Sequence, residues 1–497
     1  MAKTGTFGES LAALRQITDP MYKGDSPVPV FNWKPRPGAK AVFITAAQNA
    51  TPVNKDWWRI IQVICGHYGC DLAVPPIRYK NPTSAWTGSQ KNAEHWVEEV
   101  RPYLASVRAK LNPNVMLLGD IKIQPTAADP LTGFEAVAGA LSAIVGHPKI
   151  QTRTIATPQN RMAKILMTSG MCTVQNYSDT RAGRVGDFHH SLSGVLVELD
   201  GKRFYARRIH FDTKTRSATD AARRKRFYAD GRVVTAPRAA ALITGDLHER
   251  FADPKAVKAT WGAGGMVEVA EPNVVIFHDS SDGYAVNHWH RGNPFKKIAK
   301  YASGLDSARY ELECLRDFIR DHTRPGIGNV LVSSNHDDFY NRFIIENDWR
   351  NDPANAEWYL ETALHMVRGT KLTRRGTEYP DAFAYWMRKF DLPQTRVLNA
   401  DESFLVRGIE CGLHGDEGPN GARGSIRNLR RIGVKTITGH PHSPGEDEGC
   451  TQVGVMVDVS KGLDYTGPLS SWLQANCFVN DNGKRQLAII VDGEYHN

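Results

Sequence analysis

The chain has 497 residues, of which 41% are hydrophobic and 23% charged, and its formal net charge is +9 with a pI near 9.1. This balance excludes a disordered or fibrous protein, and the length favours two or more domains. The positive charge favours a polyanionic partner. Because the first residues lack a secretory signal and no uncharged apolar run could cross a bilayer, we expect a cytoplasmic protein that does not contact membranes.

The N-terminal part of the sequence divides into two segments. Residues 1–38 are rich in Pro and Gly and predict an extended arm. Residues 39–236 predict a separate α/β domain with parallel strand pairing. Its expected elements are strands at 41–45, 115–118, 151–156 and 163–168, helices at 56–68 and 133–145, and a hairpin between 192 and 211 that turns at Asp200 and Gly201.

Basic residues are dense between positions 202 and 238. Two interpretations are equally open: a solvated helix face, or a surface that binds a phosphate backbone. Tyr205, Phe227 and Tyr228 lie among these charges and fit either base stacking or a hydrophobic core. The basic residues in question are Arg207, Arg208, Arg223, Arg224, Lys225, Arg226 and Arg232.

Residues 237–497 predict a second α/β domain, in which apolar strands alternate with amphipathic helices. We expect helices near 306–320, 355–367 and 381–389. The expected strands are 239–244, 273–277, 329–334, 405–413, 434–438, 452–458, 474–479 and 486–492.

Acid, amide and imidazole side chains follow directly after several of these strands, where α/β folds collect their site residues. Each short motif alone has a bland explanation as a turn or a structural histidine. Their common position after apolar strands favours a shared site for divalent ions, which accept this mixture of ligands. The residues are Asp246, His248, Asp279, Asn335, His336, His414, His440 and His442.

The ordered motifs GDLH, HD, SNHD, LH and GHPH resemble the five motifs of the calcineurin-like metallophosphoesterase superfamily, over roughly residues 240–445. The resemblance implies a β-sandwich flanked by helices and a pair of divalent ions, with Mn²⁺ expected first and Mg²⁺, Zn²⁺ or Fe²⁺ as alternatives. It implies a catalytic His336 beside the scissile phosphate. It also implies one metal held by Asp246, His248, Asp279 and His442, and a second held by the bridging Asp279 with Asn335, His414 and His440.

The chain departs from the family pattern at two turns. The family usually has Gly before the second-motif Asp and the third-motif Asn, whereas this chain has His278 and Ser334. No ligand is lost, but the departures put the close backbone approach at these turns in question. Elsewhere in this half, His288 and His290 could line the cleft, but we expect them to be surface or structural histidines.

The loop at 415–425 and the helix after it supply candidate substrate-binding residues, Arg423 and Arg427. The glycines, an arginine and the helix N-terminus could hold a phosphate. The alternative is a loop that only supports His414, with Ser425 as the helix N-cap.

The expected activity is hydrolysis of DNA phosphodiester bonds. The stretches HGDEGPNGARGS and GHPHSPGEDEG also resemble the early host-DNA-degrading nucleases of tailed phages, which would place the protein in the host cytoplasm. Two alternatives stay open: a phosphatase or nucleotidase acting on a small phosphoester, and a DNA-binding scaffold with an inactive phosphoesterase domain. A homo-oligomer is also left open.

Overall fold

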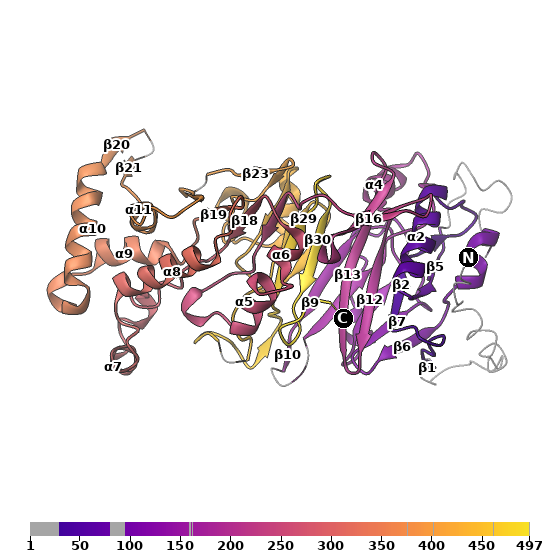
Figure 1. Cartoon of the computed structure of the whole chain (residues 1–497), viewed down its shortest axis with the longest axis horizontal. Helices are drawn as coiled ribbons and strands as arrows, with labels where there is room; N and C mark the ends of the chain where they lie inside the picture. Colours follow the sequence, from indigo (N-terminus) through magenta and orange to yellow (C-terminus); the bar gives the residue numbers. More distant parts are fainter. Residues whose placement is uncertain are drawn as a thin grey trace.

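The computed structural model describes residues 29–79, 95–158, 161, 163–374, 376–400, 402–460 and 462–496. Most of the expected N-terminal arm, residues 1–28, lies outside them. The molecule is elongated, with elements from residues 30–118 at one end, helices from residues 308–389 at the other, and large sheets between them (Figure 1). A mixed α/β fold is therefore confirmed. Among the described residues, the model contains no helix with the length and apolar character needed to cross a membrane.

The largest sheet has eleven strands and mixed pairing. It runs through both halves of the sequence, because β9 pairs with β26 in antiparallel register, with Thr152 opposite Glu446. In spatial order its strands are β1 (Val30–Asn32), β6 (Arg108–Asn112), β7 (Val115–Leu118), β8 (Ser142–Val145), β11 (Lys164–Thr168), β9 (Gln151–Ile155), β26 (Gly445–Asp447), β27 (Cys450–Gln452), β25 (Lys435–Thr438), β24 (Ile409–Glu410) and β23 (Leu405–Val406).

A seven-stranded sheet belongs to the N-terminal half. Only β2 and β4 pair in parallel, and the long β12–β13 hairpin turns at Gly201 as the sequence predicted. The order of its strands is β16 (Val233–Thr235), β15 (Lys225–Tyr228), β14 (Ser217–Asp220), β13 (Arg203–Asp212), β12 (Ser193–Asp200), β2 (Ala41–Ile44) and β4 (Asp71–Ala73).

A six-stranded sheet forms the centre of the C-terminal half. Its first four strands are parallel, and β29 and β30 complete it in antiparallel register. The order is β22 (Thr395–Val397), β19 (Gly328–Leu331), β18 (Val274–Phe277), β17 (Ala241–Ile243), β29 (Ala475–Val479) and β30 (Arg485–Ile489). Three strand pairs complete the sheets: β3 (Ala47–Gln48) with β5 (Pro76–Ile77), β10 (Thr157–Pro158) with β28 (Leu469–Ser470), and β20 (Lys371–Thr373) with β21 (Gly376–Glu378).

The longer helices begin at capping side chains: Asn54 accepts a hydrogen bond from the N–H of Trp57, and Ser307 accepts one from that of Tyr310. The described α-helices are α2 (Lys55–His67), α3 (Phe134–Val137), α4 (Arg181–His189), α5 (Pro254–Trp261), α6 (Met266–Ala270), α7 (Pro294–Ser303), α8 (Ala308–His322), α9 (Asp338–Glu346), α10 (Ala356–Gly369), α11 (Ala382–Lys389) and α12 (Ile426–Leu429).

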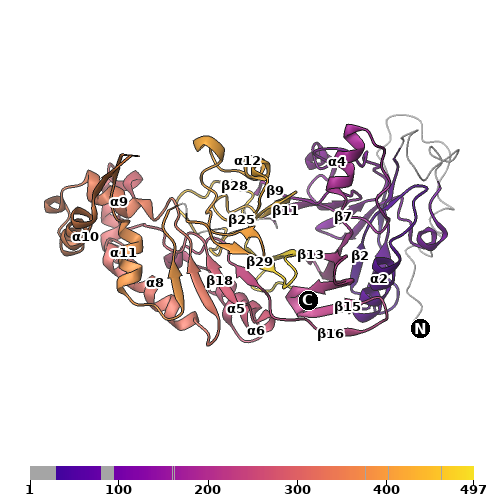
Figure 2. The same ribbon diagram turned by 90° about the horizontal axis from the view of Figure 1, so that it is seen from above.

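Separate apolar cores hold these layers together. Helix α2 packs its buried face, including Trp57, against the seven-stranded sheet. In the C-terminal half, residues of the six-stranded sheet, such as Ile276, share a core with Ile437 of β25 and Ile409 of β24. A larger core, which includes Phe277 and Leu312, joins the other face of the six-stranded sheet to the helices (Figure 2). The candidate ligands follow strands on both sides of the sandwich-like core.

The expected helix at 133–145 is wrong. Only Phe134–Val137 is α-helical, and Ser142–Val145 forms the fully buried strand β8. Gly139 adopts a left-handed φ of 58°, which ends the helix. The apolar run that follows lies between β7 and β11, where a buried strand and a buried helix have the same composition.

Both interpretations of the basic segment at 202–238 are wrong for its central arginines. The segment forms strands, and Arg207, Arg208 and Arg226 are each at most 7% exposed. Nη2 of Arg207 lies 2.9 Å from Asp220, so these charges are used in internal ion pairs. Tyr205 and Phe227 are buried core residues, although Tyr228 is half-buried.

Candidate metal centre

Three parallel strands position the candidate ligands on one side of the site. β17, β18 and β19 lie side by side, and their carboxyl ends lead into the turns that carry Asp246, Asp279 and Asn335. The loop after β24 carries His414, and the loop after β25 carries His440 and His442. Because the two groups of strands share one core, their ends converge at one edge of the fold.

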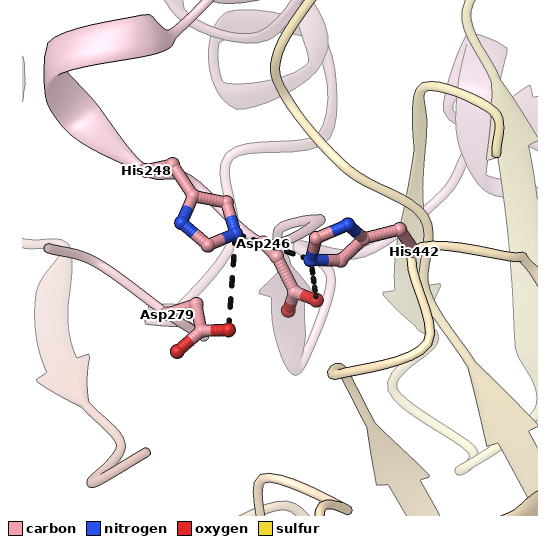
Figure 3. A group of neighbouring side chains, drawn as sticks. All are labelled: Asp246, His248, Asp279 and His442. Carbon is pink, nitrogen blue, oxygen red and sulfur yellow. Dashed lines mark hydrogen bonds and ion pairs between the residues drawn. The ribbon is translucent and has the colours of Figure 1, made fainter. Parts of the chain in front are cut away.

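Four of the expected ligands form a compact, buried group (Figure 3). One potential ligand atom from each of Asp246, His248, Asp279 and His442 lies within 4.8 Å of those of the other three. Nε2 of His442 is 3.2 Å from the Asp246 carboxylate and 3.1 Å from Nε2 of His248. Nε2 of His248 is 3.8 Å from the Asp279 carboxylate. The structure thus brings together side chains from positions almost two hundred residues apart.

The other expected ligands lie around the same Asp279. Nε2 of His414 is 3.2 Å from Oδ2 of Asp279, and Nδ1 of His440 is 3.1 Å from Oδ1 of Asn335. The backbone N–H of His440 donates a hydrogen bond to Oδ2 of Asp246 at 2.7 Å, which ties the two groups together. All seven candidate ligands therefore belong to one connected cluster, with Asp279 between its two parts.

The polar atoms at the centre of this cluster are buried but lack hydrogen-bond partners among the described residues. Oδ1 of Asp279, Oδ1 of Asp246, Nδ1 of His414 and Nδ1 of His442 have none. Burying such atoms without partners is costly, and native proteins rarely do so. A divalent cation accepts carboxylate, imidazole and amide ligands at once, so the donor set fits a metal ion.

Charges within the cluster shift its acid and base strengths strongly. Burial raises the pKa of Asp246 to about 7, and the charge of Asp279 adds to this effect. Burial would lower the pKa of His414, but the Asp279 carboxylate raises it to about 9. Burial would raise the pKa of Asp279, but the positive charges of His414 and His336 hold it well below its usual range. Such mutual shifts are typical of functional sites.

The backbone at the site adopts conformations that L-residues seldom use. His248, Asp279, His440 and His442 have φ values of 41°, 39°, 77° and 58°, all in the left-handed region. Position 439 requires glycine, because a Cβ atom there would lie 2.1 Å from Oδ1 of Asp246. Strained turns of this kind cluster at sites where ligands must be held in fixed positions.

His336 lies at the edge of the cluster. Its Nδ1 is 2.8 Å from the carbonyl oxygen of Asp282, which can only accept, so this nitrogen carries the hydrogen. Nε2 is left as the ring atom available to a ligand. His336 lines the open cleft above Asp279, where the sequence predicted a residue beside the substrate.

Asp282 was missed by sequence reasoning. Its carboxylate lies 3.0 Å from Nδ1 of His248 and 3.5 Å from Nδ1 of His336, so it orients two rings of the site. Asp282, His248 and His336 form a second group whose potential ligand atoms lie close together. The sequence did contain a sign of its role, because Asp282 is a second carboxylate three residues after Asp279 in the same motif.

The two departures from the family pattern, His278 and Ser334, are both buried. His278 is fully buried, and its ring lies 5.7 Å from that of His414. Burial and the charge of His414 lower the pKa of His278 to about 3, so its ring is neutral. The N–H of Ser334 donates to Oδ2 of Asp337 at 3.0 Å, which closes the turn that presents Asn335.

A cleft of about 640 Å³ opens over the cluster. Its wall includes two exposed aromatic rings, Trp289 and Tyr465, which are 78% and 49% exposed. Sequence reasoning missed both, since isolated aromatics carry no motif. His290, expected to be a surface or structural histidine, also lines this cleft, whereas His288 lies 3.1 Å from Arg342.

The two candidate substrate-binding arginines separate in space. Arg423 lines the cleft. Arg427 does not, and its guanidinium lies 3.7 Å from Asp129 beside a different depression. Ser425 caps α12 by accepting from the N–H of Asn428, so the predicted N-cap is confirmed.

Comparison with known proteins gives one relative. The chain is similar to Protein A1 of Escherichia phage T5, with 27% identity over 488 residues that cover 94% of this chain and 84% of that protein. The similarity therefore spans both halves of the chain. No protein-family model and no solved structure matches the chain.

Proposed function

We propose that the protein is a phosphodiesterase that depends on two divalent metal ions and hydrolyses DNA. The observation that carries this proposal is the buried group of Asp246, His248, Asp279 and His442, whose potential ligand atoms lie within 4.8 Å of one another. A cluster with a purely structural role would pair its polar atoms internally. Here several of them have no partner within the described residues, which favours a cation as the missing partner.

The residues divide into those that would hold ions and those that would act on the substrate. Ions bound at this site would supply Lewis-acid chemistry, polarising the phosphoryl group and making water a stronger nucleophile. Asp246, His248, Asp279 and His442 would hold one, and Asp279 with Asn335, His414 and His440 the other. Manganese is the first choice, with magnesium, zinc and iron as alternatives.

His336 would act on the leaving group. Its Nδ1–H is held by the Asp282 carbonyl, so Nε2 is the atom that can reach a phosphoester in the cleft. When water attacks phosphorus and the bond to the leaving oxygen breaks, a proton on Nε2 would pass to that oxygen. Arg423, exposed on the cleft wall, would neutralise charge on the substrate backbone.

The lining of the cleft supports DNA as the substrate. Two exposed aromatic rings, Trp289 and Tyr465, stand on its wall. Such rings stack on bases in nucleic-acid-binding proteins. A relative encoded by a phage supports a phage origin, and the narrower proposal is a phage nuclease that acts in the host cytoplasm.

The test uses the full chain, stripped of metal by a chelator and reloaded with Mn²⁺, Mg²⁺ or Zn²⁺. Plasmid, linear duplex, single-stranded DNA and a chromogenic phosphomonoester are offered in parallel. We expect metal-dependent cleavage of DNA and little hydrolysis of the monoester. Hydrolysis of the monoester alone would instead identify a phosphatase, and DNA binding without any cleavage would identify a scaffold.

Matched variants distinguish the loss of a site residue from a general loss of folding. Asp279→Asn and His336→Gln should both lose DNA cleavage. Asp230→Asn is the control, because this exposed carboxylate pairs only with the neighbouring Arg232 among the described residues and should leave cleavage unchanged. Full cleavage by Asp279→Asn would rule out the proposed centre.

A further inference from the structure

A second cavity lies where the two halves of the chain meet. It measures about 470 Å³ and shares no lining residue with the cleft over the metal centre. We name it the seam pocket. Its walls come from the end of α4, from β13, from the start of β25, from the turn after β26 and from the β29–β30 hairpin, and the charged or titratable residues that line it are Lys149, His189, His190, His210, Arg430, Lys435, Glu446, Glu448, Lys484 and Arg485.

The carboxylates of the seam pocket are already paired. Glu446 accepts a hydrogen bond from Thr152 at 2.7 Å and lies 3.4 Å from the buried Arg208. Glu448 lies 3.1 Å from Lys149 and 3.9 Å from Arg430. The two glutamates therefore neutralise Arg208, Lys149 and Arg430. They leave little negative charge to neutralise the other cations that line the pocket.

The cations at the mouth have no such partners. Within the described residues, neither Lys435 nor Lys484 forms an ion pair. The guanidinium of Arg485 donates to backbone carbonyl oxygens, including those of Thr436 and Glu448, and keeps its full charge. Three like charges thus converge on one cavity, an arrangement that costs free energy unless an anion is bound.

The titration of two groups agrees with this geometry. Burial lowers the pKa of Lys484, and the charges of Lys435, Arg485 and Lys214 lower it further, although Asp212 opposes them. Burial and the charges of Lys484, Arg208, Arg485 and Lys435 hold the pKa of His210 well below its usual range. His210 is therefore a neutral ring that can donate one N–H in a positive environment.

We propose that the seam pocket binds a phosphate-bearing nucleotide unit, with the ammonium groups of Lys435 and Lys484 facing the phosphate and the charge of Arg485 beside them. Cations without an ion-pair partner are common recognition elements for phosphate oxygens. The cavity is larger than a phosphate needs and falls in the size range of nucleotide-sized ligands. Phe188, 78% exposed on α4, lies at its edge and offers a face on which a base can stack.

The unit has two possible sources, a free nucleotide or one nucleotide of a DNA strand that also reaches the cleft. Both present the same chemistry to the seam pocket. The proposal does not depend on cleavage at the metal centre, so binding is measured with metal removed by a chelator. Inorganic phosphate, dAMP and a short single-stranded oligonucleotide serve as probes in calorimetry, at constant ionic strength.

The expected result is that dAMP or the oligonucleotide binds more tightly than inorganic phosphate. Lys484→Met and Lys435→Met should each weaken that binding about tenfold, the usual effect of losing one charge-assisted hydrogen bond. Lys258→Met is the matched control, because Lys258 is exposed on α5 and lies outside the lining. Tight dAMP binding assigns a free nucleotide, whereas binding of the oligonucleotide alone assigns a DNA strand.

A second readout separates binding from a structural role. Removing one of several repelling charges should leave the ligand-free Lys484→Met protein as stable to heat as the unaltered protein, or more stable. A clear loss of thermal stability would show that Lys484 is structural and would overturn the proposal. So would equal binding by the unaltered protein and both variants, or binding of inorganic phosphate with no gain from the nucleoside.

Discussion

Two fully buried polar clusters in this molecule differ in one respect. In the N-terminal half, both oxygens of Asp220 are bonded, to Arg207 and to the Tyr68 hydroxyl. In the C-terminal half, Oδ1 of Asp246 and Oδ1 of Asp279 have no hydrogen-bond partner in the described part of the chain. Both clusters bury charge, so burial alone does not distinguish them. The difference lies in the carboxylates, because both oxygens of Asp220 are hydrogen-bonded, whereas Asp246 and Asp279 each keep one oxygen on which a cation could bind.

The pKa values follow the same contrast. Burial would raise the pKa of Asp220, but Arg207 lowers it below its usual value. Burial raises the pKa of Asp246 to about 7, and its neighbours do not bring it back. The Asp220 carboxylate is therefore stabilised by protein groups alone, whereas the Asp246 carboxylate would be stabilised by a bound cation.

The largest expected effect is on catalysis, from Asp246→Asn. The amide oxygen can still accept from the N–H of His440, but the variant loses the charge that would hold a cation. We expect DNA cleavage to fall by several orders of magnitude, with metal-free thermal stability unchanged or higher. Cleavage assays and calorimetric melting check both parts. A large loss of metal-free stability would mean that Asp246 is a structural carboxylate.

The paired cluster should behave in the opposite way. Asp220→Asn leaves the buried Arg207 guanidinium with less compensating charge, so the free energy of unfolding should fall by about 3–5 kcal/mol. Chemical denaturation measures this loss. It should be the same with and without Mn²⁺, and a metal-dependent difference would contradict the division between the clusters.

Metal loading gives the next effect in size. If cations bind the folded chain alone, Mn²⁺ at about 100 times its dissociation constant should stabilise the protein by about 2.7 kcal/mol. Melting with Mn²⁺ and with a chelator measures the shift. Asp246→Asn should reduce the shift, because it removes a ligand of one of the two ions, and Asp220→Asn should retain it in full.

The smallest effect concerns a residue that orients a ligand. Asp282 lies 3.0 Å from Nδ1 of His248 and would fix the direction of its Nε2. Asp282→Asn should weaken metal affinity by about 10- to 100-fold, as for other partners of metal-ligating histidines. Calorimetric titration with Mn²⁺ tests this, with Asp230→Asn as control. Unchanged affinity would show that His248 needs no such support.

The sequence predicted what is local and periodic. The strands around Phe43, Ile276 and Ile437 were expected and are confirmed, and the candidate ligands were found because each follows such a strand. The side chains of Asp246 and His442 lie together although 196 positions separate them in the chain. Family order predicted that convergence, which no periodicity could.

What the sequence could not show is non-local. Arg207 and Arg208 have the composition of a phosphate-binding surface, and only their partners Asp220 and Glu446 show that they are internal. The seam pocket escaped prediction for the same reason, since Lys435 and Lys484 meet only in the folded chain.

The pairing of β9 with β26 has a practical consequence for dissecting this protein. A fragment that starts at residue 237 would leave the edge of β26 without its neighbour, and an unpaired edge invites aggregation. It would also lose Thr152 and Arg208 from around Glu446. A loss of activity after truncation could therefore result from misfolding and would not reveal the function of either half. Point substitutions in the intact chain avoid this problem.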